Sequence, residues 1–141
     1  MIYKYFKDKK ISALGMGTMR LPTLSDNSSI DVEKTAEIID YAIKHGVNYF
    51  DTAFGYHGGN SESVVGQILS GYERDSFYLA TKYPSYDVKV FGKNAEIFEK
   101  QLEKCKTDYF DFYLFHNVCE NNIEHYLKVT RIIRTCLKAI N

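Results

Sequence analysis

Four polar side chains stand out because each lies at, or just after, the end of a short apolar run. Asp51 ends Val-Asn-Tyr-Phe-Asp, and Tyr56 lies in the loop that follows. Lys82 ends Phe-Tyr-Leu-Ala-Thr-Lys, and His116 ends Phe-Tyr-Leu-Phe-His. Such runs are typical of β-strands, and chemistry gathered at the carboxyl ends of successive strands is the layout of an α/β-barrel active site. We therefore expect these side chains to lie together.

These residue types could together protonate an oxygen atom. Reduction of a carbonyl by hydride needs an acid that protonates the oxygen as negative charge builds on it. A free tyrosine, with a pKa of about 10, is a weak acid at neutral pH. A neighbouring ammonium lowers that pKa because it favours the phenolate. Tyr56 is the candidate acid, Lys82 the ammonium, and Asp51 the carboxylate that keeps the lysine charged and in place. His116 could share the proton or orient the carbonyl.

The elements that must position these side chains alternate along the chain. Strands alternating with helices predict a parallel sheet covered by helices, and the nearly continuous apolar strands agree with burial on both faces. Asp31 is expected to cap the first helix and Gly46 to end it. The sequence predicts a hairpin from 3–6 and 10–12, strands over 13–18, 47–51, 77–82 and 109–116, and helices over 31–45, 61–69, 92–105 and 122–140.

The inward faces of these helices follow from their periodicity. Val64, Val65, Ile68 and Leu69 are expected to face inward from the helix over 61–69. In the helix over 92–105, Phe98, Leu102 and Cys105 share one face. On the last helix, Lys128, Arg131, Arg134 and Lys138 form a basic stripe, for which a solvated face and a docking surface are the alternatives.

The composition fits one soluble domain. The 141 residues are 45% hydrophobic and 15% aromatic, and 18 Lys and Arg balance 18 Asp and Glu. This balance gives no reason to expect nucleic acid or an anionic membrane as a partner. No apolar run is long enough for a membrane span or a signal peptide. Cys105, Cys119 and Cys136 are odd in number and widely spaced, so we expect reduced thiols in a cytoplasmic protein.

The chain resembles the aldo-keto reductase family at the residues described above. The matching stretches run over 14–20, 46–56, 81–82 and 108–117, in the family's order and spacing. The similarity covers the chain from about Ile2 to about Leu127. Residues 56–62, Tyr-His-Gly-Gly-Asn-Ser-Glu, are most similar to the bacterial branch whose full-length members often carry a C-terminal ferredoxin-like iron–sulfur domain.

The resemblance implies an NAD(P)H-dependent oxidoreductase on a (β/α)8, or TIM, barrel that reduces an aldehyde or ketone. By the same resemblance, Tyr56 is the general acid, Lys82 and Asp51 tune it, and His116 orients the carbonyl of a small-molecule substrate.

The resemblance also indicates where a cofactor would lie. Gly17 and Thr18 match positions that border the nicotinamide end, and Asp51 borders the nicotinamide ribose. NADP is the implied cofactor, with NAD as the alternative. An iron–sulfur cluster is expected only if a further domain exists, and we expect no metal site in residues 1–141.

The length predicts an incomplete barrel. A (β/α)8 barrel typically needs about 250 residues, so 1–141 is expected to hold a truncated domain: an N-terminal hairpin and the first four βα units. The first and fourth strands would be open edges, and the inward face would lack its usual cover. The alternatives to a reductase are a non-catalytic half-barrel remnant, or a module that interacts or self-associates through the open half-barrel.

Two glycine patterns point to other nucleotide sites but lack their full signatures. Gly15-Met16-Gly17 is not followed by the third glycine of a Rossmann fingerprint. Gly58-Gly59 is not followed by Lys-Ser or Lys-Thr, so a phosphate-binding loop is not expected. His57 has no obvious metal-ligating neighbours in the sequence.

Overall fold

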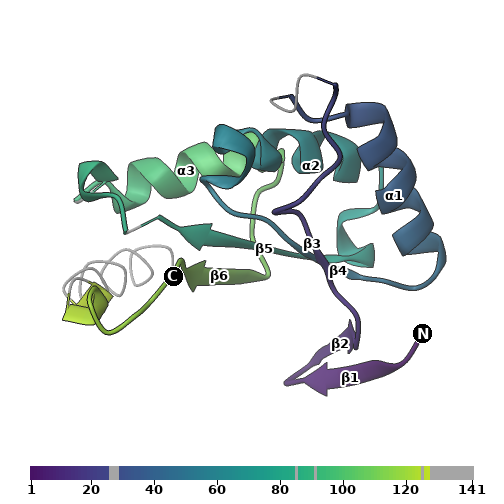
Figure 1. Ribbon diagram of the computed structural model, residues 1–141. Coiled ribbons are helices and arrows are strands. Elements are labelled where there is room, and N and C mark those ends of the chain that lie inside the picture. Colours follow the sequence, from purple (N-terminus) through teal and green to yellow (C-terminus); the bar gives the residue numbers. More distant parts are fainter. Residues whose placement is uncertain (26–28, 85, 91, 125, 128–141) are drawn as a thin grey trace.

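A parallel four-stranded sheet, with the strand order β3-β4-β5-β6, forms the centre of the computed structural model. The structure describes residues 1–25, 29–84, 86–90, 92–124 and 126–127. Helices α1, α2 and α3 cover one face of the sheet, and the β1–β2 hairpin lies at the amino ends of the strands (Figure 1). The strands are β1 (Tyr3–Phe6), β2 (Lys9–Ser12), β3 (Met16–Gly17), β4 (Tyr49–Asp51), β5 (Tyr78–Tyr83) and β6 (Phe112–Phe115). The helices are α1 (Val32–Lys44), α2 (Ser61–Leu69) and α3 (Asn94–Cys105), with 3₁₀ turns η1 (Tyr56–Gly59), η2 (Arg74–Ser76) and η3 (Val88–Val90).

The predicted order of elements is confirmed, from the hairpin through the alternating strands and helices. Asp31 caps α1 by accepting a hydrogen bond from the Lys34 backbone N–H at 2.9 Å. Gly46 follows the helix with a φ of 86°, a left-handed conformation that suits glycine. The predicted bounds of α2 are those observed. The described residues show helix at 123–124 and 126–127, and the rest of the helix predicted over 122–140, with its basic stripe, lies outside them.

The main core lies between the helices and the sheet. Ile39 of α1, Val65 and Leu69 of α2, and Phe50 and Leu79 of the sheet are all buried in one cluster. Burial of each such side chain stabilises the fold by about 1.5–3 kcal/mol. Because Phe50 faces the helices, its neighbour Asp51 faces the opposite side of the sheet. The core thus fixes the positions of the strand ends relative to one another, and with them the positions of the polar residues that follow.

The face of the sheet away from the helices differs from the expectation of full burial. Its aromatic rings come from neighbouring strands: Tyr49 and Tyr78 lie 5.3 and 6.4 Å from Phe112, between ring centroids. Phe6 of the hairpin covers part of this cluster at 5.8 Å from Phe112. Leu114 on the same face is 42% exposed. Among the described residues, β3 and β6 are the edges of the sheet, as predicted.

The strands predicted over 13–18 and 47–51 are shorter, at 16–17 and 49–51. The predicted starts of β6 and α3 were wrong for identifiable physical reasons. β6 begins at Phe112 rather than 109, because the Asp111 carboxylate accepts the Leu79 N–H at 2.9 Å and pairs with Arg74 at 2.8 Å. α3 begins at Asn94 rather than 92, since Gly92 has a left-handed φ of 73°.

The buried face of α3 also differs from the prediction. Phe98 and Leu102 are only half-buried, whereas Ile97 and Gln101 share the buried face with Cys105. Gln101 is drawn inward because it hydrogen bonds to partners on α2 and β5. Apolar periodicity alone could not identify a face that is held partly by polar contacts.

Candidate active site

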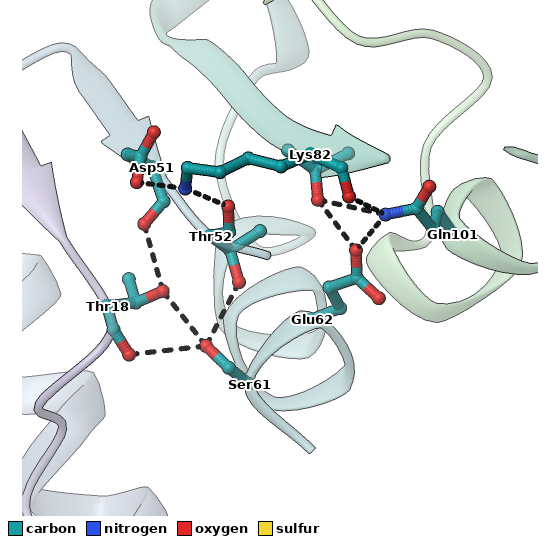
Figure 2. A network of polar contacts seen from close by, with 8 residues as sticks. Thr18, Asp51, Thr52, Ser61, Glu62, Lys82 and Gln101 are labelled. Carbon is teal, nitrogen blue, oxygen red and sulfur yellow. Dashed lines mark hydrogen bonds and ion pairs between the residues drawn. The ribbon is translucent and has the colours of Figure 1, made fainter. Parts of the chain in front are cut away.

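An ion pair joins the carboxyl ends of β4 and β5. The Lys82 Nζ donates to Asp51 Oδ1 at 2.5 Å and to the Thr52 carbonyl at 2.6 Å (Figure 2). The two side chains are only 14% and 27% exposed. Charge-assisted hydrogen bonds of this kind are stronger than neutral ones, especially where water is partly excluded. The lysine ammonium is therefore fixed in position.

Tyr56 and His116 lie beside this pair. The Lys82 Nζ lies 4.7 Å from the centroid of the Tyr56 ring. The His116 ring meets Tyr56 edge-on, with centroids 5.5 Å apart, and meets Tyr86 in the same way at 5.3 Å. The structure thus brings together the four side chains that sequence reasoning singled out.

His116 lies in surroundings that favour its neutral form. Burial lowers the pKa of its imidazole, the Lys82 ammonium lowers it further, and the Asp51 carboxylate opposes this in part. Its Nδ1 is buried and has no hydrogen-bond partner among the described residues. A neutral imidazole carries one N–H donor and one acceptor nitrogen. Such a ring could donate a hydrogen bond to a carbonyl oxygen without bringing a second positive charge beside Lys82.

Contacts on both sides hold the loop that carries Tyr56. His57 and Gly58 have left-handed φ values of 51° and 63°, which turn the chain sharply after Tyr56. His57 Nε2 accepts the Leu21 backbone N–H at 3.0 Å. Lys104 of α3 donates to the Gly59 carbonyl at 2.9 Å. His57 therefore anchors this loop to the segment after β3, a role that its sequence neighbours did not indicate.

A cluster of buried hydroxyl groups ties the strand ends to the start of α2. Ser61 Oγ shares hydrogen bonds with Thr18 Oγ1 at 2.9 Å and Thr52 Oγ1 at 3.0 Å (Figure 2). Thr18 Oγ1 also contacts the Asp51 carbonyl at 3.0 Å, as a donor. All three residues are fully buried. The cluster fixes the backbone of Asp51 and of Thr52, whose carbonyl accepts from Lys82.

The residues predicted to border a cofactor lie at the ends of β3 and β4. Gly17 lies opposite Asp51 in the parallel register. It is exposed, and a Cβ added to it would meet nothing within 4 Å. Thr18 is different, since its side chain is committed to the hydroxyl cluster. Among the described residues, no group of three or more His, Cys, Asp or Glu side chains could hold a metal ion. No helix in this part of the chain is long and apolar enough to cross a membrane.

Sequence reasoning missed two buried polar side chains next to the site. Glu62 of α2 and Gln101 of α3 are both fully buried. Glu62 Oε1 accepts from Thr81 Oγ1 and from Gln101 Nε2, each at 2.6 Å. A signal was available for Glu62, because helical spacing places it on the same inward stripe as Val65 and Leu69. The same signal was available for Gln101, which lies four residues from both Ile97 and Cys105 on the buried face of α3.

Comparison with known proteins identifies the family of the chain. The profile of the Aldo/keto reductase family matches residues 13–139. The uncharacterized oxidoreductase YqkF of Bacillus subtilis is 35% identical over 132 residues, covering 83% of this chain and 39% of that protein. Methylglyoxal reductase YeaE of Escherichia coli is 33% identical over 110 residues, covering 77% of this chain and 36% of that protein.

Solved structures share the fold over nearly the whole chain. The thermostable aldo-keto reductase Tm1743 matches with a TM-score of 0.70 and 26% identity, covering 93% of this chain and 50% of its own. An aldo-keto reductase from Klebsiella pneumoniae in complex with NADPH matches with a TM-score of 0.66 and 27% identity, covering 93% and 46%. The chain thus spans half or less of the length of these relatives. With the family profile matched over most of its residues, the chain belongs to the aldo/keto reductase family.

Proposed function

We propose that this chain carries the proton-transfer part of an NAD(P)H-dependent reduction of an aldehyde or ketone. The observation that supports this most directly is the Lys82 ammonium, held by Asp51 at 2.5 Å and lying 4.7 Å from the Tyr56 ring centroid. Family membership supports the reaction class. Residues 1–141 would act as a partial barrel domain, with the cofactor pocket shared between these strand ends and other parts of the barrel.

Each residue would have a defined role in the reaction. Tyr56 donates its phenolic proton as negative charge develops on the carbonyl oxygen. The Lys82 ammonium stabilises the phenolate that remains. Asp51 holds the Lys82 ammonium in place through the hydrogen bond of 2.5 Å. His116, neutral because its pKa is lowered, donates a hydrogen bond that orients the carbonyl.

The ends of β3 and β4 fit the nicotinamide end of a cofactor. Bound NADPH, or NADH as the alternative, would supply the hydride. Open space at Gly17 lets a flat ring approach the backbone, and Asp51 lies opposite it in register. Thr18 would contribute by holding the Asp51 backbone, since its own side chain is fully buried. The NADPH complex of the Klebsiella pneumoniae relative supports this choice of cofactor.

Steady-state kinetics with a complete barrel that contains this chain test the assignment. Methylglyoxal is a suitable first substrate, because one relative is named a methylglyoxal reductase. In Tyr56→Phe, the rate of NADPH oxidation should fall by about 10²–10⁴-fold, the usual contribution of a general acid. Tyr41→Phe, which changes an exposed tyrosine on α1, should retain the parent rate. A Tyr56→Phe protein as fast as the parent would exclude Tyr56 as the acid.

A second candidate function is a non-catalytic module that self-associates through the open face of the sheet. Leu114, which is exposed on the face of the sheet opposite α1, α2 and α3, favours it. Titration of NADPH fluorescence separates the two candidates. Saturable quenching at micromolar cofactor supports the reductase, whereas no binding by the parent chain supports the module.

A further inference from the structure

We propose that Glu62 is a positioning residue that sets the geometry of both Lys82 and the loop of Tyr56. The inference rests on the proposed function of those two residues. Glu62 contacts neither of them directly. It is fully buried at the first turn of α2, directly after the Tyr56 loop. Its two carboxylate oxygens have different partners: one accepts from β5, the strand of Lys82 (Figure 2), and the other lies near Lys104 of α3.

One oxygen holds the strand of Lys82. Glu62 Oε1 accepts from Thr81 Oγ1 and Gln101 Nε2, each at 2.6 Å. The same Gln101 nitrogen donates to the Lys82 carbonyl at 3.1 Å. Since Thr81 and Lys82 are adjacent in β5, these contacts fix the backbone from which the Lys82 side chain extends toward Asp51.

The other oxygen acts on the loop of Tyr56. Glu62 Oε2 lies 3.6 Å from Lys104 Nζ, an ion pair too long to be a hydrogen bond. Lys104 in turn donates to the carbonyl of Gly59 at 2.9 Å. Gly59 is the last residue of η1, the turn that begins at Tyr56. The Glu62 carboxylate therefore attracts the cation that holds the acid-bearing loop against α3.

Packing alone does not account for a carboxylate at this position. Burying an ionised carboxylate is expensive unless it is paired and hydrogen-bonded, and an apolar side chain would serve the inward stripe of α2 as well. A carboxylate can accept a hydrogen bond from Thr81 of β5 on one side and attract the Lys104 ammonium on the other, which an apolar side chain cannot do. The preceding residue, Ser61, fixes the Asp51 backbone through Thr18. The first turn of α2 thus supports both members of the Asp51–Lys82 pair.

Chemical labelling of lysine amines tests the proposal without any need for turnover. Acetic anhydride at sub-saturating amounts, followed by mass spectrometry, reports how freely each lysine of the folded chain reacts. In Thr81→Val, labelling of Lys82 relative to the exposed Lys34 should rise about tenfold, the effect of one lost hydrogen bond of ordinary strength on an equilibrium. In Glu62→Gln the rise should be smaller, because the amide oxygen still accepts both hydrogen bonds but without the charge of the carboxylate.

Matched variants separate positioning from general loosening. Thr81→Ser keeps the hydroxyl that Glu62 accepts from and should restore the parent labelling of Lys82. Glu96→Gln removes an exposed carboxylate from α3 and should change nothing at Lys82. If Glu62→Gln does not fold, the comparison of Thr81→Val with Thr81→Ser still tests the proposal.

Unchanged labelling of Lys82 in the folded variants would overturn the proposal. An equal rise in the labelling of Lys9 would also overturn it, because Lys9 pairs with Asp111 away from Glu62 and its labelling reports loosening of the whole fold. A parent chain that does not reduce carbonyls would refute the proposed function but would leave this readout intact.

Discussion

The surroundings of His116 connect proton binding to folding. In the folded chain its pKa lies below the ordinary value, because the imidazole is partly buried and faces the Lys82 ammonium. In the unfolded chain the imidazole returns to a pKa of about 6.5. Below that pH the unfolded chain binds a proton that the folded chain does not, so acid favours unfolding.

The free energy of unfolding should therefore fall as the pH falls from about 6.5 through the lower folded pKa of His116. Above a pH of about 6.5, the contribution of the neutral His116 to the free energy of unfolding is fully present. In His116→Gln, which has no proton to gain, this part of the pH dependence should disappear. Urea unfolding of both proteins at several pH values from about 5 to about 8 measures the difference. Identical pH profiles would show that His116 is not held in its neutral form.

Individual residues could be predicted when their chemistry and their place at a strand end agreed. Asp51, Lys82 and His116 were found because each polar side chain ends an apolar run. The contacts of Glu62 and Gln101 were missed because their partners lie at least 12 residues away along the chain. A polar contact across such distances leaves no local periodicity in the sequence.

The crossing of α2 and α3 depends on a glycine. A Cβ added to Gly66 would lie 2.4 Å from the Cys105 Cα and 2.5 Å from its carbonyl carbon. These are backbone atoms of α3 and cannot rotate away. Gly66 lies on the buried face of α2, one turn beyond Glu62, so the close approach of the helices also brings Gln101 within reach of the carboxylate.

Gly66→Ala should accordingly destabilise the protein by about 1–3 kcal/mol, the usual effect of overpacking. It should also raise the labelling of Lys82, since α3 must move and take Gln101 with it. Gly71→Ala is the control, because a Cβ there would meet only the Ile68 carbonyl at 3.4 Å and should cost within about 0.5 kcal/mol. Urea unfolding measures both variants. Equal stability of the two would mean that the helices can separate without loss.

The elements themselves were predicted well where local signals exist. Capping by Asp31 and the left-handed Gly46 set the ends of α1, and apolar spacing set α2. The start of β6 could not be predicted, because the Asp111 carboxylate replaces a strand partner and binds Arg74 from a distant turn.

At the scale of the molecule, the sheet is covered unequally. Helices pack on one face (Figure 1). Aromatic rings, among them Phe6 of the hairpin, partly cover the other face. Exposed apolar surface on a sheet with free edges favours association between molecules. The parallel order of strands was predictable from their alternation with helices. The half-exposed face could not be predicted, since an apolar run in the sequence does not show whether one or both faces of the strand are covered.

Leu114→Lys should reduce any self-association of the chain, because it places a charge on the exposed face of the edge strand β6. Light scattering across a concentration series compares it with the parent. Ile38→Lys changes a similarly exposed residue on α1 and should leave the molecular mass of the parent unchanged. A parent chain that is monomeric at all concentrations would contradict self-association through this face.

The distant partners of Glu62 have a consequence for synthesis on the ribosome. Thr81 follows Glu62 by 19 residues, and Gln101 follows it by 39. At about 5–20 residues per second, the Gln101 partner is made roughly 2–8 s after the carboxylate. Until then the carboxylate lacks its Gln101 partner, and burying a carboxylate that is incompletely paired is expensive. We therefore expect the nascent α2 to dock only after α3 has emerged, so that the two helices enter the native structure together.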